Sequence, residues 1–220
     1  MIYLIADPHG DPEFRGLAEY LATAGSDDLL IVLGDLGIRF EDSELNRRFD
    51  KLLLEANVDI AFIDGNHENY PYINSFPEEE WQGGRIRRLS PHLIYLMRGE
   101  IYDIQGHSFF VMGGCKSSPK WREAGLWYPG EEPTEEETAR AVHNLAKAGL
   151  SVDYVLTHKF AYRPDPKTPC PTLESLCAFI LDRVEYRAWY AGHNHVPKLY
   201  TDTPYPVRIV YDELTPIDPI

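Results

Sequence analysis

The chain has 220 residues, of which 44% are hydrophobic and 25% charged, and this length allows one sizeable core, so we expect a single domain spanning residues 1–220. Its net charge of -14 repels long polyanions, which argues against an extended basic surface that holds nucleic acid. No apolar run could cross a bilayer or form a signal-peptide core, and the 3 cysteines include no CxxC pair, so we expect a soluble, cytoplasmic protein with reduced thiols.

The first part of the chain predicts alternating strands and helices. Apolar runs at residues 1–7, 28–35 and 58–66 are typical of buried strands, and apolar residues at helical spacing follow the first two runs. This order predicts parallel strand pairing with right-handed crossovers. The positions expected to face the sheet are Phe14, Leu17, Ala18 and Leu21 in the first helix, and Leu45, Phe49, Leu52 and Leu53 in the second.

The middle and the end of the chain predict a mixed arrangement. Residues 92–114 are expected to form sequential strands with a hairpin at Gln105-Gly106-His107, and a long polar and aromatic loop follows at 115–133. Thr134 and Glu137 form the capping-box pattern that opens a helix. The remaining predicted elements are a strand at 152–158, a helix at 172–184 and strands at 186–195 and 207–214.

Side chains that can bind metal ions follow five of the predicted strands. In an open α/β sheet the carboxyl ends of the strands border one crevice, so these side chains should converge. Carboxylates, an amide oxygen and imidazoles suit manganese, iron or zinc, and we expect no thiolate among them. The candidates are Asp7 and His9 after the first strand, Asp35 after the second, Asn66 after the third, His158 after residue 157, and His193 with His195 near the end.

Two pairs of these candidates are separated by a single residue, in Asp7-Pro8-His9 and His193-Asn194-His195. In extended backbone, residues at this spacing project to the same side, so each pair is expected to bind one ion. Taken singly, such a turn or a histidine at a strand end is more often an ordinary surface or core residue. The ordered set, with each motif at the end of its own strand, favours a metal site.

The chain resembles the calcineurin-like metallophosphoesterases through Asp7-Pro8-His9-Gly10, Gly34-Asp35, Gly65-Asn66-His67-Glu68, Thr157-His158 and Gly192-His193-Asn194-His195. The resemblance implies an α/β fold, a four-layer αββα sandwich of two mixed sheets flanked by helices, with two transition metal ions (Mn, Fe or Zn) at its edge. It implies that Asp7, His9 and His195 hold the first ion, that Asn66, His158 and His193 hold the second, and that Asp35 bridges them. His67 would be catalytic, protonating the leaving oxygen or stabilising the charge on the phosphorane, and we expect Glu68 to support the site or a helix start.

The expected reaction is hydrolysis of a small phosphodiester or phosphomonoester, with a nucleotide as one candidate, by attack of a metal-bridging hydroxide. A nuclease is an alternative that the acidity of the chain disfavours. A non-catalytic scaffold of the same fold is another, and the complete set of ligand positions disfavours it.

Four cations are candidate substrate contacts, namely Arg39, Lys116, Lys120 and Arg122. Arg39 lies where the family's serine/threonine phosphatases carry a phosphate-binding arginine, but Ile38 replaces the aspartate that orients the histidine there, which disfavours protein phosphatase activity. The other three lie among aromatic residues of the 115–133 loop, a mixture that could bind a phosphate and stack on a base. Ordinary solvated charges are the alternative for all four.

Overall fold

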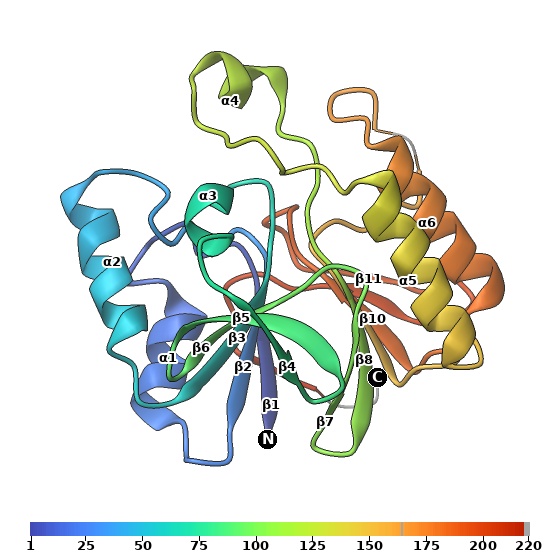
Figure 1. The fold of residues 1–220 in the computed structure, drawn as a ribbon, viewed down its shortest axis with the longest axis horizontal. Helices are drawn as coiled ribbons and strands as arrows, with labels where there is room; N and C mark the ends of the chain where they lie inside the picture. The colour runs from blue at the N-terminus through green and yellow to red at the C-terminus, as the bar shows by residue number, and fades with distance from the viewer. Residues whose placement is uncertain (164, 218–220) are drawn as a thin grey trace.

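Two mixed β-sheets packed face to face form the centre of the protein, seen here in a computed structural model that describes residues 1–163 and 165–217 (Figure 1). The first sheet contains, in spatial order, β13 (Thr215–Pro216), β1 (Ile2–Ile5), β2 (Leu29–Leu33), β3 (Asp59–Ile63), β6 (Leu93–Leu96), β5 (Gly84–Ser90) and β4 (Glu78–Trp81). The second contains β11 (Lys198–Tyr200), β12 (Val207–Ile209), β10 (Ala188–Ala191), β9 (Tyr154–Thr157), β8 (His107–Met112) and β7 (Ile101–Ile104). Helices cover the outer faces of both sheets, so the expected αββα architecture is confirmed.

The parallel pairing expected for the first three strands is present, because β1 pairs with β2 and β2 with β3. These strands are apolar on both faces because one face meets the other sheet and the opposite face meets helices. Along β2, Ile31 and Leu33 lie in the core between the sheets, whereas Leu30 and Val32 lie in the core under the helices. Each fully buried side chain of this kind contributes roughly 1.5–3 kcal/mol.

Helices α1 (Arg15–Thr23) and α2 (Glu44–Leu54) cover the outer face of the first sheet. Of the expected inward residues, Phe14, Leu17, Phe49 and Leu53 are buried, and Leu21 and Leu52 are partly buried against the same core. Two expectations were wrong. Ala18 is exposed, and Tyr20 packs in the core instead, where its hydroxyl donates a 2.8 Å hydrogen bond to the Asp59 carbonyl. Leu45 is 49% exposed, because the first turn of α2 packs on a polar loop and not on an apolar surface. The buried Asn46 holds that loop through hydrogen bonds to the Glu41 N–H and the Gly37 carbonyl.

The second sheet is covered by α5 (Glu135–Lys147) and α6 (Pro171–Arg183), whose apolar faces share one core with β8, β9 and β10. The capping box that the sequence predicts at the start of α5 is present, with Thr134 and Glu137 each bonding the other's backbone N–H. Such a pair satisfies two donors at the helix start that would otherwise lack partners.

We had expected the strands at 92–114 to be sequential neighbours, but they belong to two different sheets. β6 leaves for the first sheet, where it runs parallel to β3, and only β7 and β8 form an antiparallel hairpin. That hairpin turns at Gln105 and Gly106, which both have positive φ (52° and 80°), the conformation of a tight primed turn.

The hairpin of β4 and β5 was not predicted, because its strands lack an apolar alternation. Instead, charged side chains face each other across it: Arg87 lies 2.8 Å from Glu78, and Arg88 lies 3.3 Å from Glu79. Charged side chains on an edge strand disfavour pairing with another chain.

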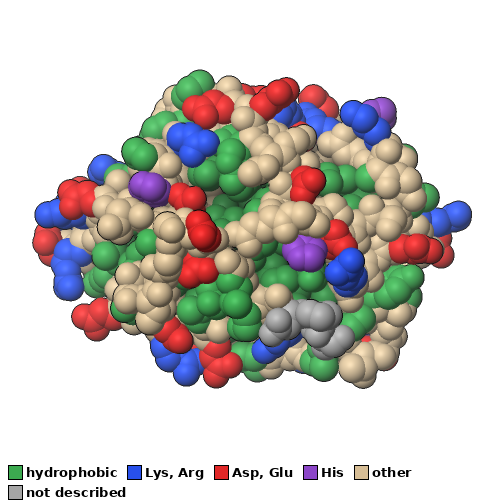
Figure 2. Space-filling view, turned by 90° about the horizontal axis from the view of Figure 1, so that it is seen from below, with side chains coloured by type: hydrophobic (Ala, Val, Ile, Leu, Met, Phe, Trp, Pro, Cys, Tyr) green, Lys and Arg blue, Asp and Glu red, His purple; other side chains and the backbone are tan. Residues whose placement is uncertain are grey.

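The carboxyl ends of the parallel strands lie at the upper edge of Figure 1, where the short helices α3 (Tyr70–Ile73) and α4 (Pro119–Glu123) also lie. Figure 2 shows the opposite edge of the molecule, on which acidic and basic side chains are interspersed. Across residues 1–163 and 165–217, the helices are too short or too polar to cross a membrane.

Candidate metal centre and cleft

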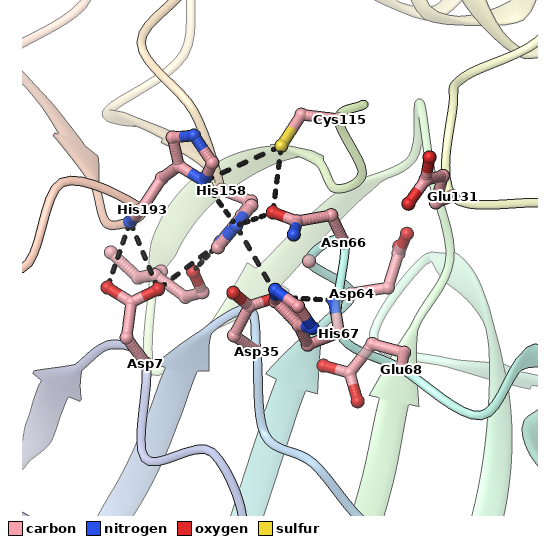
Figure 3. A network of polar contacts seen from close by, with 12 residues as sticks. Asp7, Asp35, Asp64, Asn66, His67, Glu68, Cys115, Glu131, His158 and His193 are labelled. Atoms are coloured by element: carbon pink, nitrogen blue, oxygen red, sulfur yellow. Dashed lines mark hydrogen bonds and ion pairs between the residues drawn. The ribbon is translucent and has the colours of Figure 1, made fainter. Parts of the chain in front are cut away.

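The candidate ligands come from both sheets and meet at the edge where the two sheets are packed together. Loops after the neighbouring strands β1, β2 and β3 supply one half of the set, and loops after the neighbouring strands β9 and β10 supply the other. The convergence expected from the sequence is therefore present, although it joins two sheets rather than the strand ends of one (Figure 3).

Left-handed backbone turns aim these side chains. The residues with positive φ here are Asp7 (60°), His9 (48°), Asp35 (53°), His193 (69°) and His195 (52°). The expectation of extended backbone for the two spaced pairs was therefore wrong. Non-glycine residues in this region carry a conformational cost and are frequent at functional sites. Hydrogen bonds hold the turns, for example from the His9 N–H to the Asp35 carbonyl at 2.9 Å.

The first group of side chains contains Asp7, His9, Asp35 and His195, whose ligand atoms lie within 4.8 Å of one another. The Nε2 atoms of His9 and His195 are 3.0 Å apart, and His9 Nε2 is 3.6 Å from Asp35 Oδ2. Ligands bound to one ion at about 2.0–2.2 Å lie roughly 3 Å from each other, so these separations fit one metal ion.

The second group contains His158, His193 and Asn66 (Figure 3). His158 Nε2 lies 3.2 Å from His193 Nδ1 and 3.3 Å from Asn66 Oδ1, which again fits one ion. The expectation that His193 and His195 act on one ion was wrong, because they belong to different groups. Cys115 also lies here, with Sγ 3.1 Å from Asn66 Oδ1 and 3.6 Å from His193 Nδ1. Sequence reasoning did not include Cys115 among the candidates, because it lies three residues beyond β8 and outside the strand-end motifs.

Asp35 lies between the two groups. Its Oδ2 atom is 3.6 Å from His9 Nε2 in the first group, and its Oδ1 atom is 3.6 Å from His158 Nε2 in the second. Oδ1 also accepts a 2.7 Å hydrogen bond from the His67 N–H, which fixes the carboxylate. One carboxylate thus faces both groups with different oxygens.

The candidate ligands are themselves held by hydrogen bonds from behind. His158 Nδ1 lies 2.8 Å from the Leu33 carbonyl, which sets the proton on Nδ1 and leaves Nε2 free to bind a metal. The Asn66 amide donates to Ser117 at 3.1 Å, so its oxygen points to the site. Glu68 is fully buried and accepts from the Leu36 and Gly37 N–H groups at 2.8 Å and 3.2 Å. This supporting position for Glu68 is one of the two that we had expected.

A family model for the calcineurin-like phosphoesterases matches residues 1–197. The chain belongs to this family. Its members are metal-dependent phosphoesterases in general, and the two groups of ligand atoms accord with that. A search of curated proteins found no match.

Several solved structures resemble this phosphoesterase. TT1561 of Thermus thermophilus has a TM-score of 0.53 and 15% identity, covering 96% of this chain and 88% of that chain. A phosphopantetheinyl hydrolase from Mycobacterium tuberculosis has a TM-score of 0.42 and 18% identity over 99% of this chain and 96% of that one. A putative 5′-nucleotidase from Staphylococcus aureus has a TM-score of 0.49 and 14% identity over 94% of this chain and 48% of that one. At these identities the likeness to the first shows a shared fold.

Burial and neighbouring charges set the protonation of the phosphoesterase site. Burial, with His158 nearby, lowers the pKa of His193 to about 3, and burial also lowers the pKa values of His9, His67 and His195. Burial alone would raise the pKa of Asp35, but positive charge on the imidazoles of His158, His9 and His67, together with the hydrogen bond from the His67 N–H, outweighs it and lowers that pKa. Metal ions bind the neutral form of an imidazole and the ionised form of a carboxyl group, and these shifts favour both forms.

A cleft of about 530 Å³ opens above both groups. Asp35, Asn66 and His193 line it from the metal side, and Phe40, Trp121 and Leu126 line it with apolar surface. Among residues 1–163 and 165–217, Lys167 is the only lysine or arginine that lines the cleft. Sequence reasoning missed Lys167 because it does not follow a strand end.

His67 lines the cleft beside the candidate ligands. Its ring packs edge-to-face on Phe40 at 5.3 Å, on Trp121 at 5.4 Å and on His9 at 5.3 Å between ring centroids. The fully buried Ile38 occupies the position at which the family's serine/threonine phosphatases have an aspartate that orients the histidine. Aromatic packing therefore orients the His67 ring in this protein.

The four candidate substrate cations do not line the cleft. Arg39 pairs with Asp50 at 3.5 Å, Lys116 pairs with Glu132 at 3.5 Å, and Arg122 pairs with Glu131 and Glu132. Arg122 also lies 4.4 Å from the centre of the Trp127 ring, and Lys120 lies 4.9 Å from that of Trp121. Among the four, Lys120 is thus the one whose charged group lies against an aromatic ring of the cleft wall.

A buried charged network behind the site joins the long loop to the loop after β3 that carries Asn66. Asp64 is fully buried and accepts hydrogen bonds from the Tyr70 and Tyr95 hydroxyls and the Arg98 Nε, each at 2.9 Å. Arg98 also donates to the Gly130 carbonyl at 2.8 Å. No sequence motif pointed to this network, because its members lie far apart along the chain and meet only in the folded protein.

Proposed function

We propose that this protein hydrolyses a small phosphodiester or phosphomonoester at a dinuclear metal centre. The observation that carries the proposal is the position of Asp35, whose two oxygens lie 3.6 Å from ring nitrogens of the two different groups. A carboxylate placed in this way can hold two ions side by side. The complete set of ligand positions favours this enzyme over a non-catalytic scaffold.

The ligand assignment follows the two groups. Asp7, His9 and His195 hold the first ion, Asn66, His158 and His193 hold the second, and Asp35 contacts both. A pair of divalent transition metal ions, manganese, iron or zinc by ligand type, would polarise the phosphoryl oxygens and activate a water molecule as the nucleophile. The proposal includes a cytoplasmic location, where the free thiols of Cys115, Cys170 and Cys177 stay reduced.

His67 acts as the acid for the leaving group in this proposal. It lines the cleft and is adjacent to Asn66, but its ring belongs to neither group of candidate ligands. Burial lowers the pKa of its imidazole, which disfavours the protonated form, whereas the negative charges of Asp35 and Glu131 favour it. A phosphate dianion entering the cleft adds negative charge and favours the protonated form further, so substrate binding would supply the acid when it is needed.

The cleft favours a substrate with a phosphate and a flat or apolar leaving group. Phe40 and Trp121 offer aromatic faces next to the metal side, and base–aromatic stacking is worth about 1–3 kcal/mol per base. Lys167 supplies a positive charge for the rest of the substrate. A small nucleotide has these features, whereas a nuclease would need a longer basic track than these residues provide.

The test is hydrolysis of matched nitrophenyl phosphate mono- and diesters by the purified full chain, with added Mn²⁺ and with chelator. We expect metal-dependent turnover of at least one ester, lost in Asp35→Asn and retained in Asp103→Asn, a control at an exposed aspartate of the distant β7–β8 hairpin. Faster cleavage of oligonucleotides than of mononucleotide esters would favour a nuclease. Silence towards all phosphoesters by a fully metal-loaded protein would contradict the proposed function.

A further inference from the structure

Cys115 lies directly against the second group of candidate ligands. It follows β8, next to β9, whose end carries His158, and it is fully buried. Figure 3 shows its sulfur above Asn66 and beside His193, pointing to the same space as their ligand atoms. Cys115, His158 and His193 each offer one ligand atom, and these atoms lie within 4.8 Å of one another.

We propose that Cys115 is a further ligand of the second metal ion, an inference that rests on the dinuclear site proposed above. Bonds of about 2.3 Å to sulfur and about 2.0–2.1 Å to nitrogen, at angles between about 90° and 110°, place neighbouring ligand atoms of one ion roughly 3.1–3.5 Å apart for sulfur–nitrogen pairs and roughly 2.9–3.3 Å apart for nitrogen–nitrogen pairs. The Cys115 Sγ to His193 Nδ1 separation is 3.6 Å, and the His193 Nδ1 to His158 Nε2 separation is 3.2 Å.

The backbone holds Cys115 in this position. The Gly114 N–H donates a 2.8 Å hydrogen bond to the Asp64 carbonyl, one residue before Gly65-Asn66, so the two ligand loops are joined. Gly113 packs so closely that a Cβ atom there would lie 2.2 Å from Asp64 Oδ1. The sulfur therefore stays beside Asn66 without any loop movement.

The other two cysteines provide a comparison within the same chain. Cys170 and Cys177 are also free and buried, but they lie at the start and in the interior of α6, and neither belongs to a group of candidate metal ligands within residues 1–163 and 165–217. Burial in the core is therefore common to all three thiols, whereas contact with two candidate ligands distinguishes Cys115.

A thiolate ligand changes which metal the second position prefers. Thiolate is a soft ligand that favours zinc, iron or cobalt over manganese, which prefers oxygen donors. The two positions of the centre would then differ, since the first offers only imidazole and carboxylate atoms. We expect the second position to retain zinc in competition with manganese, and the Cys115→Ala variant to lose that preference. Binding releases the thiol proton to solvent as the metal–sulfur bond forms.

The test is spectroscopy of the metal-loaded full chain. With Co²⁺, we expect a near-ultraviolet sulfur-to-cobalt charge-transfer band in the wild-type protein, lost in Cys115→Ala and retained in the matched variants Cys170→Ala and Cys177→Ala. With Zn²⁺, X-ray absorption of the wild-type protein should show one sulfur at about 2.3 Å for each pair of zinc ions, a result that needs no variant to fold.

The outcomes distinguish a failure of the Cys115 ligand from a failure of the dinuclear site. Two bound cobalt ions with ligand-field bands but no charge-transfer band would overturn the thiolate ligand and leave the dinuclear site intact. A charge-transfer band that survives in Cys115→Ala would assign the sulfur to another cysteine and also overturn it. A chain that binds no cobalt and no zinc would overturn both.

Discussion

Replacing Gly65 by alanine tests how closely the loops of the metal centre are packed. A Cβ atom at this position would lie 2.1 Å from Asp35 Oδ1 and 2.4 Å from the Asp35 backbone nitrogen, whereas ordinary contacts begin at 3.4 Å. Rotation of the Asp35 side chain cannot relieve the second clash, so the whole residue must move by about 1 Å, the difference between 2.4 Å and 3.4 Å. The backbone of Gly65 itself has no positive φ, so crowding rather than backbone strain is the perturbation.

The displaced residue is the one that faces both groups, so the effect should reach both of the proposed metal ions. A misplacement of about 1 Å in a catalytic site can cost about 100-fold in rate. Crowding a packed interior costs roughly 1–3 kcal/mol of folding free energy, and each kcal/mol lowers the melting temperature by about 2–4 °C in a protein of this size. We therefore expect a folded variant that melts a few degrees lower and retains fewer than two ions per chain.

The assay compares Gly65→Ala with Gly25→Ala, an exposed position where the nearest atom to the added Cβ is 3.6 Å away. Metal content after desalting, far-ultraviolet circular dichroism and the rate on the better nitrophenyl ester are measured for both variants. The control should match the wild type in all three. If Gly65→Ala also held two ions and turned over at the wild-type rate, the close packing of Gly65 on Asp35 would be refuted.

Three further changes test separate parts of the account. His67→Gln should keep both metals and lower the turnover number by about 10²–10⁴-fold, the usual contribution of general acid catalysis, and an unchanged rate on every ester would remove its assigned role. Because the pKa of His193 falls to about 3 in the folded protein, its imidazole binds a proton more readily in the unfolded chain, so the metal-free protein loses stability as the pH falls below about 6.5, by about 2 kcal/mol at pH 5 from this group. In urea unfolding at pH 7.5 and pH 5, the loss of stability in His193→Asn should be smaller than in the wild type by that amount. An equal loss in both proteins would count against the shifted pKa. Arg98→Met should lower the free energy of unfolding by about 3–5 kcal/mol, because the carboxylate of Asp64 loses its charged partner in the core. In urea titrations the double variant with Asp64→Asn should recover part of this loss, whereas additive losses would argue against a stabilising Arg98–Asp64 ion pair.

Much of the fold and of the candidate site could be predicted because the signals were local. Each candidate ligand follows an apolar strand, and the family motifs occur in order, so His158 and Asn66 could be expected to meet although they are far apart in sequence. Local patterns also predicted the capping box at Thr134 and the turn at Gln105. They could not show that β6 would join a different sheet from β7, because that depends on which face each strand buries.

The site details that were missed depend on tertiary packing. The left-handed turns at Asp7 and His9 follow from hydrogen bonds to the loop after β2, and no residue type in the sequence demanded them. Cys115 is in a loop whose composition suggested phosphate binding, and its approach to Asn66 follows from the bond between Gly114 and Asp64. Arg39 and Arg122 do not reach the cleft, because they pair with Asp50 and Glu131, which lie outside the strand-end motifs.

We propose that one chain holds two metal ions with Asp35 between them, and electron paramagnetic resonance of the protein titrated with Mn²⁺ can count and distinguish such ions. We expect two ions to bind per chain and the loaded protein to give the spectrum of an exchange-coupled pair, because a shared carboxylate would join the ions. Saturation at one ion, or two ions with independent single-manganese spectra, would contradict it.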